Sequence, residues 1–147
     1  MILMADRLQR RTAAAGAVLL VIAFLTGILL AQAQSQKIDA DVSEVVAAHL
    51  NALLGGLWLL ALAATLPWLR FGPTGRKRIA TVTALAAYAN WLVTTVKSFL
   101  HVPGVDLDGR KSNDAVFVAL TVLVVIPSFV ASIVWVYGLL GARSNDD

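Results

Sequence analysis

Apolar residues are gathered into four long runs that are separated by short polar segments. The runs cover about residues 12–33, 43–68, 79–101 and 114–140. Each is about 20 residues or longer, which is the length an α-helix needs to cross the hydrocarbon core of a bilayer. Hydrophobic residues make up 59% of the 147 residues and charged residues 14%, where a soluble domain has roughly a quarter charged. The pattern predicts an all-α integral membrane protein, with four transmembrane helices bundled into one domain, 1–147.

The first run has two possible interpretations. Basic residues precede it and it ends in Ala31-Gln32-Ala33, as in a secretory signal with its cleavage site. Its length is nevertheless roughly that of a full span and exceeds the core of a usual signal. We therefore expect residues 12–33 to remain as a transmembrane helix.

Basic residues are unevenly distributed among the polar segments, which predicts an orientation. Three Lys or Arg precede the first run, four lie in 69–78 and one in the tail, against one in 34–43 and two in 102–113. Because basic loops stay in the cytoplasm, both termini and the 69–78 turn are expected there. We expect a multi-pass protein of the bacterial inner (cytoplasmic) membrane. The net charge of +3 does not indicate a nucleic-acid partner, because the basic residues gather at helix ends.

Several kinds of chemistry are excluded by composition. The chain has no cysteine, which rules out disulfides, iron–sulfur clusters, thiolate-ligated haem and covalent c-type haem. It lacks paired metal-binding histidines, a Gly-rich phosphate loop and a Ser/His/acid set. Carboxylates are absent from the helix interiors, which counts against a proton-driven transporter.

Polar residues within the second and third runs are the candidates for chemistry, because they are costly to place in a membrane. The second run carries His49, Asn51 and the pair Gly55-Gly56. On the third run, polar or small residues recur every three or four positions and share one helical face: Thr83, Ala87, Asn90, Thr94, Lys97 and His101. Helix rise places four of these polar residues at similar depth in the outer half of the membrane, as one candidate site that Lys97 can also join: His49, Asn51, Asn90 and Thr94.

Each of these residues also has a purely structural interpretation. Lys97 can extend to the lipid headgroups, and His101 can be an interfacial residue at a helix end. Asn90 and Thr94 can form hydrogen bonds between helices. His49 is the hardest to explain structurally, because an imidazole in an apolar setting needs partners for both nitrogens.

The second and third runs resemble a known family. The segments AAHLNALLGGLWLLALAATLPWLRF (47–71) and YANWLVT (88–94) are similar to hydroxylaminobenzene mutases and, more distantly, to styrene oxide isomerases. Both groups are small four-helix membrane proteins. The similar features are the A-H-L start, a Gly seven residues after the His, the Leu-Pro exit and Tyr-Ala-Asn-Trp-Leu.

The resemblance implies an isomerase that binds haem b. In the epoxide isomerases, the His of the second helix is the axial ligand, ferric iron acts as a Lewis acid, and an Asn and a Tyr orient the epoxide. Those proteins are homotrimers with haem near the subunit interfaces. By analogy we expect His49 to bind iron and Gly55 and Gly56 to contact haem. We expect three residues to contact a small aromatic substrate: Asn90, Asn51 and Thr94.

Two positions depart from the family pattern. Gly55 stands where the family has an Asn, and Thr94 where it has a Tyr, although Asn90 is retained and Asn51 lies one turn before Gly55. The missing Tyr counts against epoxide isomerisation, and YANWL favours the other branch. We therefore expect a mutase of aromatic degradation that rearranges an arylhydroxylamine to an aminophenol at ferric haem. The alternatives are an aryl epoxide (styrene oxide-type) isomerase that gives an aldehyde, and a non-enzymatic membrane subunit.

Overall fold

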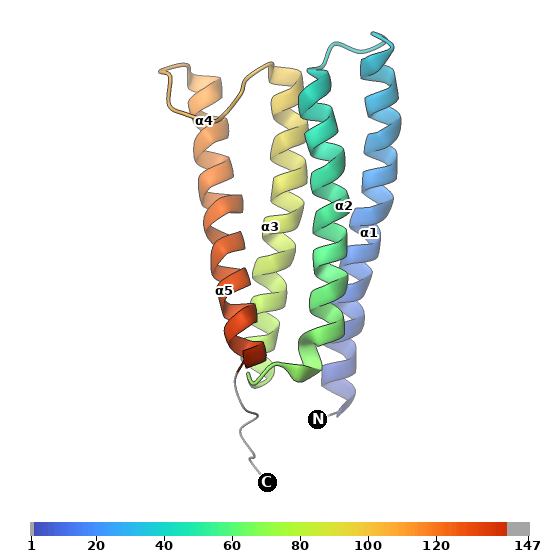
Figure 1. Ribbon diagram of the computed structural model, residues 1–147, viewed down its shortest axis with the longest axis vertical. Coiled ribbons are helices and arrows are strands. Elements are labelled where there is room, and N and C mark those ends of the chain that lie inside the picture. The colour runs from blue at the N-terminus through green and yellow to red at the C-terminus, as the bar shows by residue number, and fades with distance from the viewer. Residues whose placement is uncertain (1, 141–147) are drawn as a thin grey trace.

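The computed structural model describes residues 2–140, and over that range the only regular structure is helical. Four rods run up and down in succession (Figure 1). The first three are α1 (Ile2–Gln34), α2 (Val42–Thr65) and α3 (Pro73–Leu100), and the 3₁₀ turn η1 (Leu66–Trp68) follows α2. The fourth rod comprises α4 (Lys111–Leu120), the π-helical segment η2 (Thr121–Val125) and α5 (Ile126–Leu140). All four rods are long and apolar enough to cross a membrane, which confirms the predicted membrane fold.

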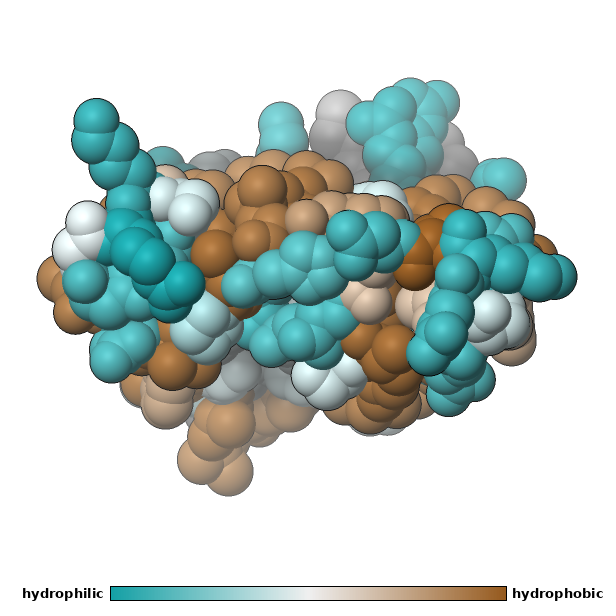
Figure 2. Space-filling view, turned by 90° about the horizontal axis from the view of Figure 1, so that it is seen from above, coloured by the Kyte–Doolittle hydropathy of each residue, from teal (hydrophilic) through white to brown (hydrophobic). Residues whose placement is uncertain are grey.

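The rods form a row more than a closed square. α1 packs along α2, α2 along α3, and the fourth rod mainly against α3. Figure 2, seen from above, shows an elongated outline with apolar flanks. We call the end with the 66–72 turn the basic end and the opposite end, with segments 35–41 and 101–110, the loop end. Near the basic end α5 reaches α2, where Trp135 Nε1 donates a hydrogen bond to Thr65 Oγ1 at 2.9 Å.

Small residues bring the first three helices together. A Cβ atom added to Gly16 would lie 2.8 Å from the carbonyl oxygen of Gly56, so the backbones of α1 and α2 are in direct contact there. A Cβ added to Gly55 would meet Leu19 of α1 at 3.0 Å and Ala87 of α3 at 3.1 Å. Lipid is as apolar as the helices, so the hydrophobic effect does not drive the helices together inside a membrane. Close van der Waals packing of this kind stabilises their association instead.

The helix ends differ from the sequence expectations in places that local chemistry explains. α1 begins at Ile2 instead of about residue 12, and residues 7–11 are polar but helix-favouring Arg, Leu and Gln. α3 begins at Pro73 instead of about residue 79, with Pro in the first turn, where its missing N–H is unneeded. The N-cap of α2 is Asp41, whose carboxylate accepts hydrogen bonds from the backbone N–H groups of Ser43 and Glu44.

The fourth rod is not a regular α-helix throughout. The π-helical segment η2 ends two residues before Pro127. Proline has no N–H for the helical hydrogen-bond pattern and its ring crowds the preceding turn, so the local widening relieves that conflict.

Candidate functional site

His49 faces α1 at the seam between the first two helices. Its Nδ1 lies 2.8 Å from the carbonyl oxygen of Ala23, and the ring passes over Gly27, where a Cβ would lie 3.3 Å from His49 Cε1. The side chain is partly buried. Among residues 7–140, whose side chains the structure describes, Nε2 has no hydrogen-bond partner and is not sealed from the surface. One imidazole nitrogen is therefore held while the other is available to a ligand.

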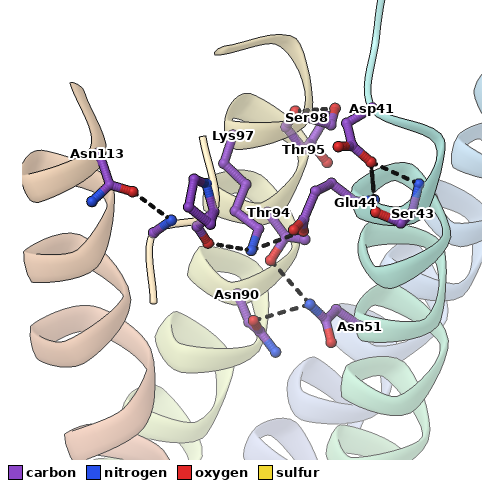
Figure 3. Close-up of polar contacts among 12 residues, drawn as sticks. Asp41, Ser43, Glu44, Asn51, Asn90, Thr94, Thr95, Lys97, Ser98 and Asn113 are labelled. Carbon is purple, nitrogen blue, oxygen red and sulfur yellow. Dashed lines mark hydrogen bonds and ion pairs between the residues drawn. The ribbon is translucent and has the colours of Figure 1, made fainter. Parts of the chain in front are cut away.

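A second polar group lies between α2 and α3. Asn51 Nδ2 donates to Asn90 Oδ1 at 3.1 Å and to Thr94 Oγ1 at 3.0 Å (Figure 3). Thr94 is buried, whereas the two asparagines are partly exposed. Asn51 Oδ1 and Asn90 Nδ2 make no hydrogen bond within the described part of the chain and are not sealed off. The group thus leaves one acceptor and one donor open to a ligand.

The two groups do not form a single site within one chain. His49 and Asn51 are two residues apart on α2, which separates their directions by about 200° around the helix axis. One side chain accordingly faces α1, and the other faces α3. Within one chain the structure does not bring His49 together with Asn51, Asn90 and Thr94. Similar depth in the membrane did not imply a shared face.

An ion pair lies beside the Asn51 group, toward the loop end. Lys97 Nζ lies 2.8 Å from Glu44 Oε2 and also donates to the carbonyl oxygen of Pro103 at 3.0 Å (Figure 3). The side chains are 10% and 21% exposed, so Lys97 does not extend to the headgroups. Sequence reasoning missed Glu44. The signal was available, because Glu44 precedes Asn51 by seven residues, two helical turns, on the same face.

The 101–110 segment is fastened to the top of the helices. Asn113 is fully buried, and its Oδ1 accepts from the N–H of Gly104 at 2.8 Å while its Nδ2 donates to Asp106 O at 2.7 Å. Together with the hydrogen bond from Lys97 Nζ to Pro103 O, these bonds hold the segment near the loop ends of α3 and α4. His101 is half exposed there, with Nε2 3.1 Å from Asp39 Oδ1, as expected of an interfacial residue.

The remaining polar groups of α3 connect it to α1. Tyr88 Oη donates to the carbonyl oxygen of Ala15 at 2.8 Å, and Trp91 Nε1 donates to Thr26 Oγ1 at 3.0 Å. Tyr88 is therefore engaged in helix packing and does not replace the tyrosine that the family pattern has at Thr94.

Gly55 and Gly56 are both buried between helices. Leu19 and Ala87 lie against Gly55, and Leu20 and the backbone of Gly16 lie against Gly56. Neither glycine presents open space to a flat ligand within one chain. Within one chain both glycines contribute to helix packing, and their contact with a cofactor stays a prediction.

The family is decided by comparison with known proteins. The family model described as styrene oxide isomerase matches residues 8–140, nearly the whole chain. The chain belongs to the styrene oxide isomerase family. The resemblance seen in the second and third helices is thereby confirmed, and the family is one of isomerases.

A relative of this styrene oxide isomerase family member is hydroxylaminobenzene mutase HabB of Ectopseudomonas oleovorans, which is 33% identical over 92 residues. The aligned region covers 63% of this chain and 52% of the relative, so the chain spans about half of that protein's length. No solved structure matches the chain.

Proposed function

We propose that this protein is a membrane mutase that binds haem b through His49 and rearranges an arylhydroxylamine to an aminophenol. The observation that carries the proposal is the state of His49, with Nδ1 bonded to a backbone carbonyl and Nε2 left for a ligand. Metal-ligating histidines commonly donate their other ring N–H to a carbonyl or carboxylate. The family and the similarity to a hydroxylaminobenzene mutase support the choice of reaction.

The donor set fits haem better than a bare ion. Among residues 7–140, whose side chains the structure describes, no three His, Asp or Glu are close enough together to hold a metal ion. Haem needs only one protein ligand, because the macrocycle supplies four nitrogens. When bound, ferric haem would supply a Lewis acid that polarises the N–O bond.

The Asn51 group fits a hydroxylamino substituent. Asn51 Oδ1 can accept from its N–H or O–H, and Asn90 Nδ2 can donate to its oxygen. In the rearrangement, the oxygen leaves nitrogen and bonds a ring carbon, which loses a proton, while nitrogen gains one. Asn90 stabilises the negative charge that develops on the departing oxygen, and Thr94 holds Asn51 in place.

A site that uses both groups must combine two copies of the chain, because they lie on different sides of α2. The row of helices leaves large apolar side chains exposed along its flanks, including Phe24, Ile28 and Leu54. A second copy packed against these residues would cover the ring of the haem and bring its own Asn51 group to His49. We propose a homotrimer with haem near its subunit interfaces.

We propose that the protein lies in a bacterial inner membrane, with its apolar flanks in contact with lipid and its basic end in the cytoplasm. The four helices that are long and apolar enough to span a membrane, and the basic residues at one end, support this location. A small apolar aromatic substrate that partitions into the bilayer would then reach the Asn51 group from the side.

Two measurements test the proposal. The purified protein should show a haem absorption band that is lost in His49→Ala and kept in His101→Ala, which removes the other histidine. Phenylhydroxylamine should be converted to aminophenol by the wild type and by His101→Ala, but not by His49→Ala. A His49→Ala protein that keeps both the band and the turnover would overturn the proposal.

Styrene oxide isomerisation is the second candidate, favoured by the family model itself. Product analysis with styrene oxide and phenylhydroxylamine separates the two. Thr94 in place of the expected tyrosine and the engagement of Tyr88 with Ala15 lead us to place the hydroxylamine first.

A further inference from the structure

At the seam between α1 and α2, the ring of His49 contacts Ala23 and Gly27 of α1. We infer that the Ala23 carbonyl and the absent side chain at Gly27 are positioning elements that keep the proton of His49 on Nδ1 and leave the lone pair on Nε2. The use of that lone pair by iron rests on the proposed function. The tautomer itself rests only on the contacts described here.

The hydrogen bond determines where the proton lies. A carbonyl oxygen only accepts, so the 2.8 Å contact between His49 Nδ1 and Ala23 O requires the hydrogen on Nδ1. A neutral imidazole has one N–H, and Nε2 therefore carries the lone pair. Neutral histidine in water prefers the opposite arrangement, with the proton on Nε2. The seam thus selects the tautomer that is rarer in solution.

Gly27 makes this contact possible. A Cβ at position 27 would lie 3.3 Å from His49 Cε1 and 3.5 Å from Nδ1, the nitrogen that reaches Ala23. A methyl group requires the ring to yield by a few tenths of an ångström, and a branched side chain requires more. Substitution at Gly27 should therefore lengthen or break the bond to Ala23.

The same turn of α1 also contacts α3. Trp91 Nε1 of α3 donates to Thr26 Oγ1 at 3.0 Å, and Thr26 Oγ1 donates to Ile22 O at 2.8 Å. Thr26 lies between Ala23 and Gly27 in the sequence. The Ala23 carbonyl that accepts the hydrogen bond from His49 is thus on a turn of α1 that both α2 and α3 contact.

The test is the tautomer of His49, read by nitrogen NMR. The chain has two histidines, so a full-length His101→Asn protein labelled with ¹⁵N-histidine and expressed without added haem reports on His49 alone. At a pH where the imidazole is neutral, Nδ1 should resonate as a protonated nitrogen and Nε2 as an unprotonated one. Gly27→Val should lower the ratio of this tautomer to the other at least about fivefold, the worth of one hydrogen bond. Gly27→Ala should have an intermediate effect.

The control is Ala17→Val, which places the same side chain at an exposed position of α1. Helix content and elution volume identify any variant that fails to fold, in which case Gly27→Ala decides. A protonated Nε2 in the wild type would overturn the inference, as would a Gly27→Ala or folded Gly27→Val spectrum equal to that of Ala17→Val. A Nδ1–H signal in a protein that never binds haem would uphold the positioning and refute the proposed function. Haem binding by His49 together with a protonated Nε2 in the haem-free protein would do the reverse.

Discussion

Lys97 and Glu44 form an ion pair at 2.8 Å between α3 and α2, with both side chains mostly removed from solvent. Lys97 also holds Pro103 of the 101–110 segment. A charge left alone at such a place is far more costly than the complete pair. The ion pair therefore fixes the relative positions of α2, α3 and the 101–110 segment and contributes little net stability.

The Lys97→Met variant should be destabilised by about 3 kcal/mol, because it leaves the Glu44 carboxylate without its partner. The double variant Lys97→Met with Glu44→Gln should recover a large part of that loss. Equilibrium unfolding of the four proteins of this cycle measures the coupling. Losses that simply add would contradict an energetic coupling between the two groups.

The Lys97–Glu44 ion pair and its bond to Pro103 should also keep water away from Thr94, between α2 and α3. Because the chain has no cysteine, Thr94→Cys provides a unique thiol just inside the ion pair. We expect it to react slowly with a membrane-impermeant thiol reagent, and at least about tenfold faster when Lys97→Met is added. Ser35→Cys, exposed in the neighbouring loop, is the reactive reference. Equal reaction rates for Thr94→Cys and Ser35→Cys would show that position 94 is open to water.

Asn51 should matter for turnover more than for haem binding. Asn51→Ala removes the hydrogen bonds to Asn90 and Thr94 and the free Oδ1 acceptor. We expect kcat to fall about 100-fold, as for the loss of an oriented polar group at a reacting centre, with the haem band unchanged. Thr94→Val, which removes only one support of Asn51, should have a smaller effect. A normal rate for Asn51→Ala would exclude the group from the active site.

Asp41 should make the stability of the loop end depend on pH. The pKa of its carboxyl is lowered, first by the hydrogen bond from the Ser43 hydroxyl and next by the backbone N–H of Glu44. The folded protein favours the ionised carboxylate more than the unfolded chain does, so ionised Asp41 stabilises the fold. This stabilisation is complete above the ordinary pKa of 3.8 and is lost as the pH falls through the lowered pKa.

Asp41→Ala tests this cap. At pH 7 the variant should lose about 1 kcal/mol of stability, the usual worth of an N-cap. The difference in melting temperature between the variant and the wild type should be smaller at pH 3 than at pH 7. A constant difference across that range would show that the carboxylate charge is not what stabilises α2.

The sequence predicted the helices well because length and hydropathy alone define a span. The grouping of Asn51, Asn90 and Thr94 could also be predicted, since polar residues at helical spacing must find partners inside a membrane. The direction of His49 could not. Spacing gives the angle between His49 and Asn51, but which neighbouring helix receives each face depends on how Gly16, Gly55 and Gly56 bring the backbones together.

The Lys97–Glu44 pair escaped prediction for a different reason. Glu44 lies in the first turn of α2, where a charged residue normally meets water, and its partner Lys97 comes from another helix, α3. The N-cap of α2 is likewise not determined by residue type, because both Asp41 and Ser43 suit such a position and Asp41 occupies it.

The row arrangement has a consequence for the order in which the protein is made. Tyr88 and Trp91 tie α3 back to α1, so three helices can complete their mutual contacts while the ribosome is still synthesising the rest. The fourth rod, which packs mainly against α3, joins an assembly that already exists. Variants in α5 should then impair a late docking step, while variants at Gly16 or Gly56 should impair the earlier packing of α1 against α2.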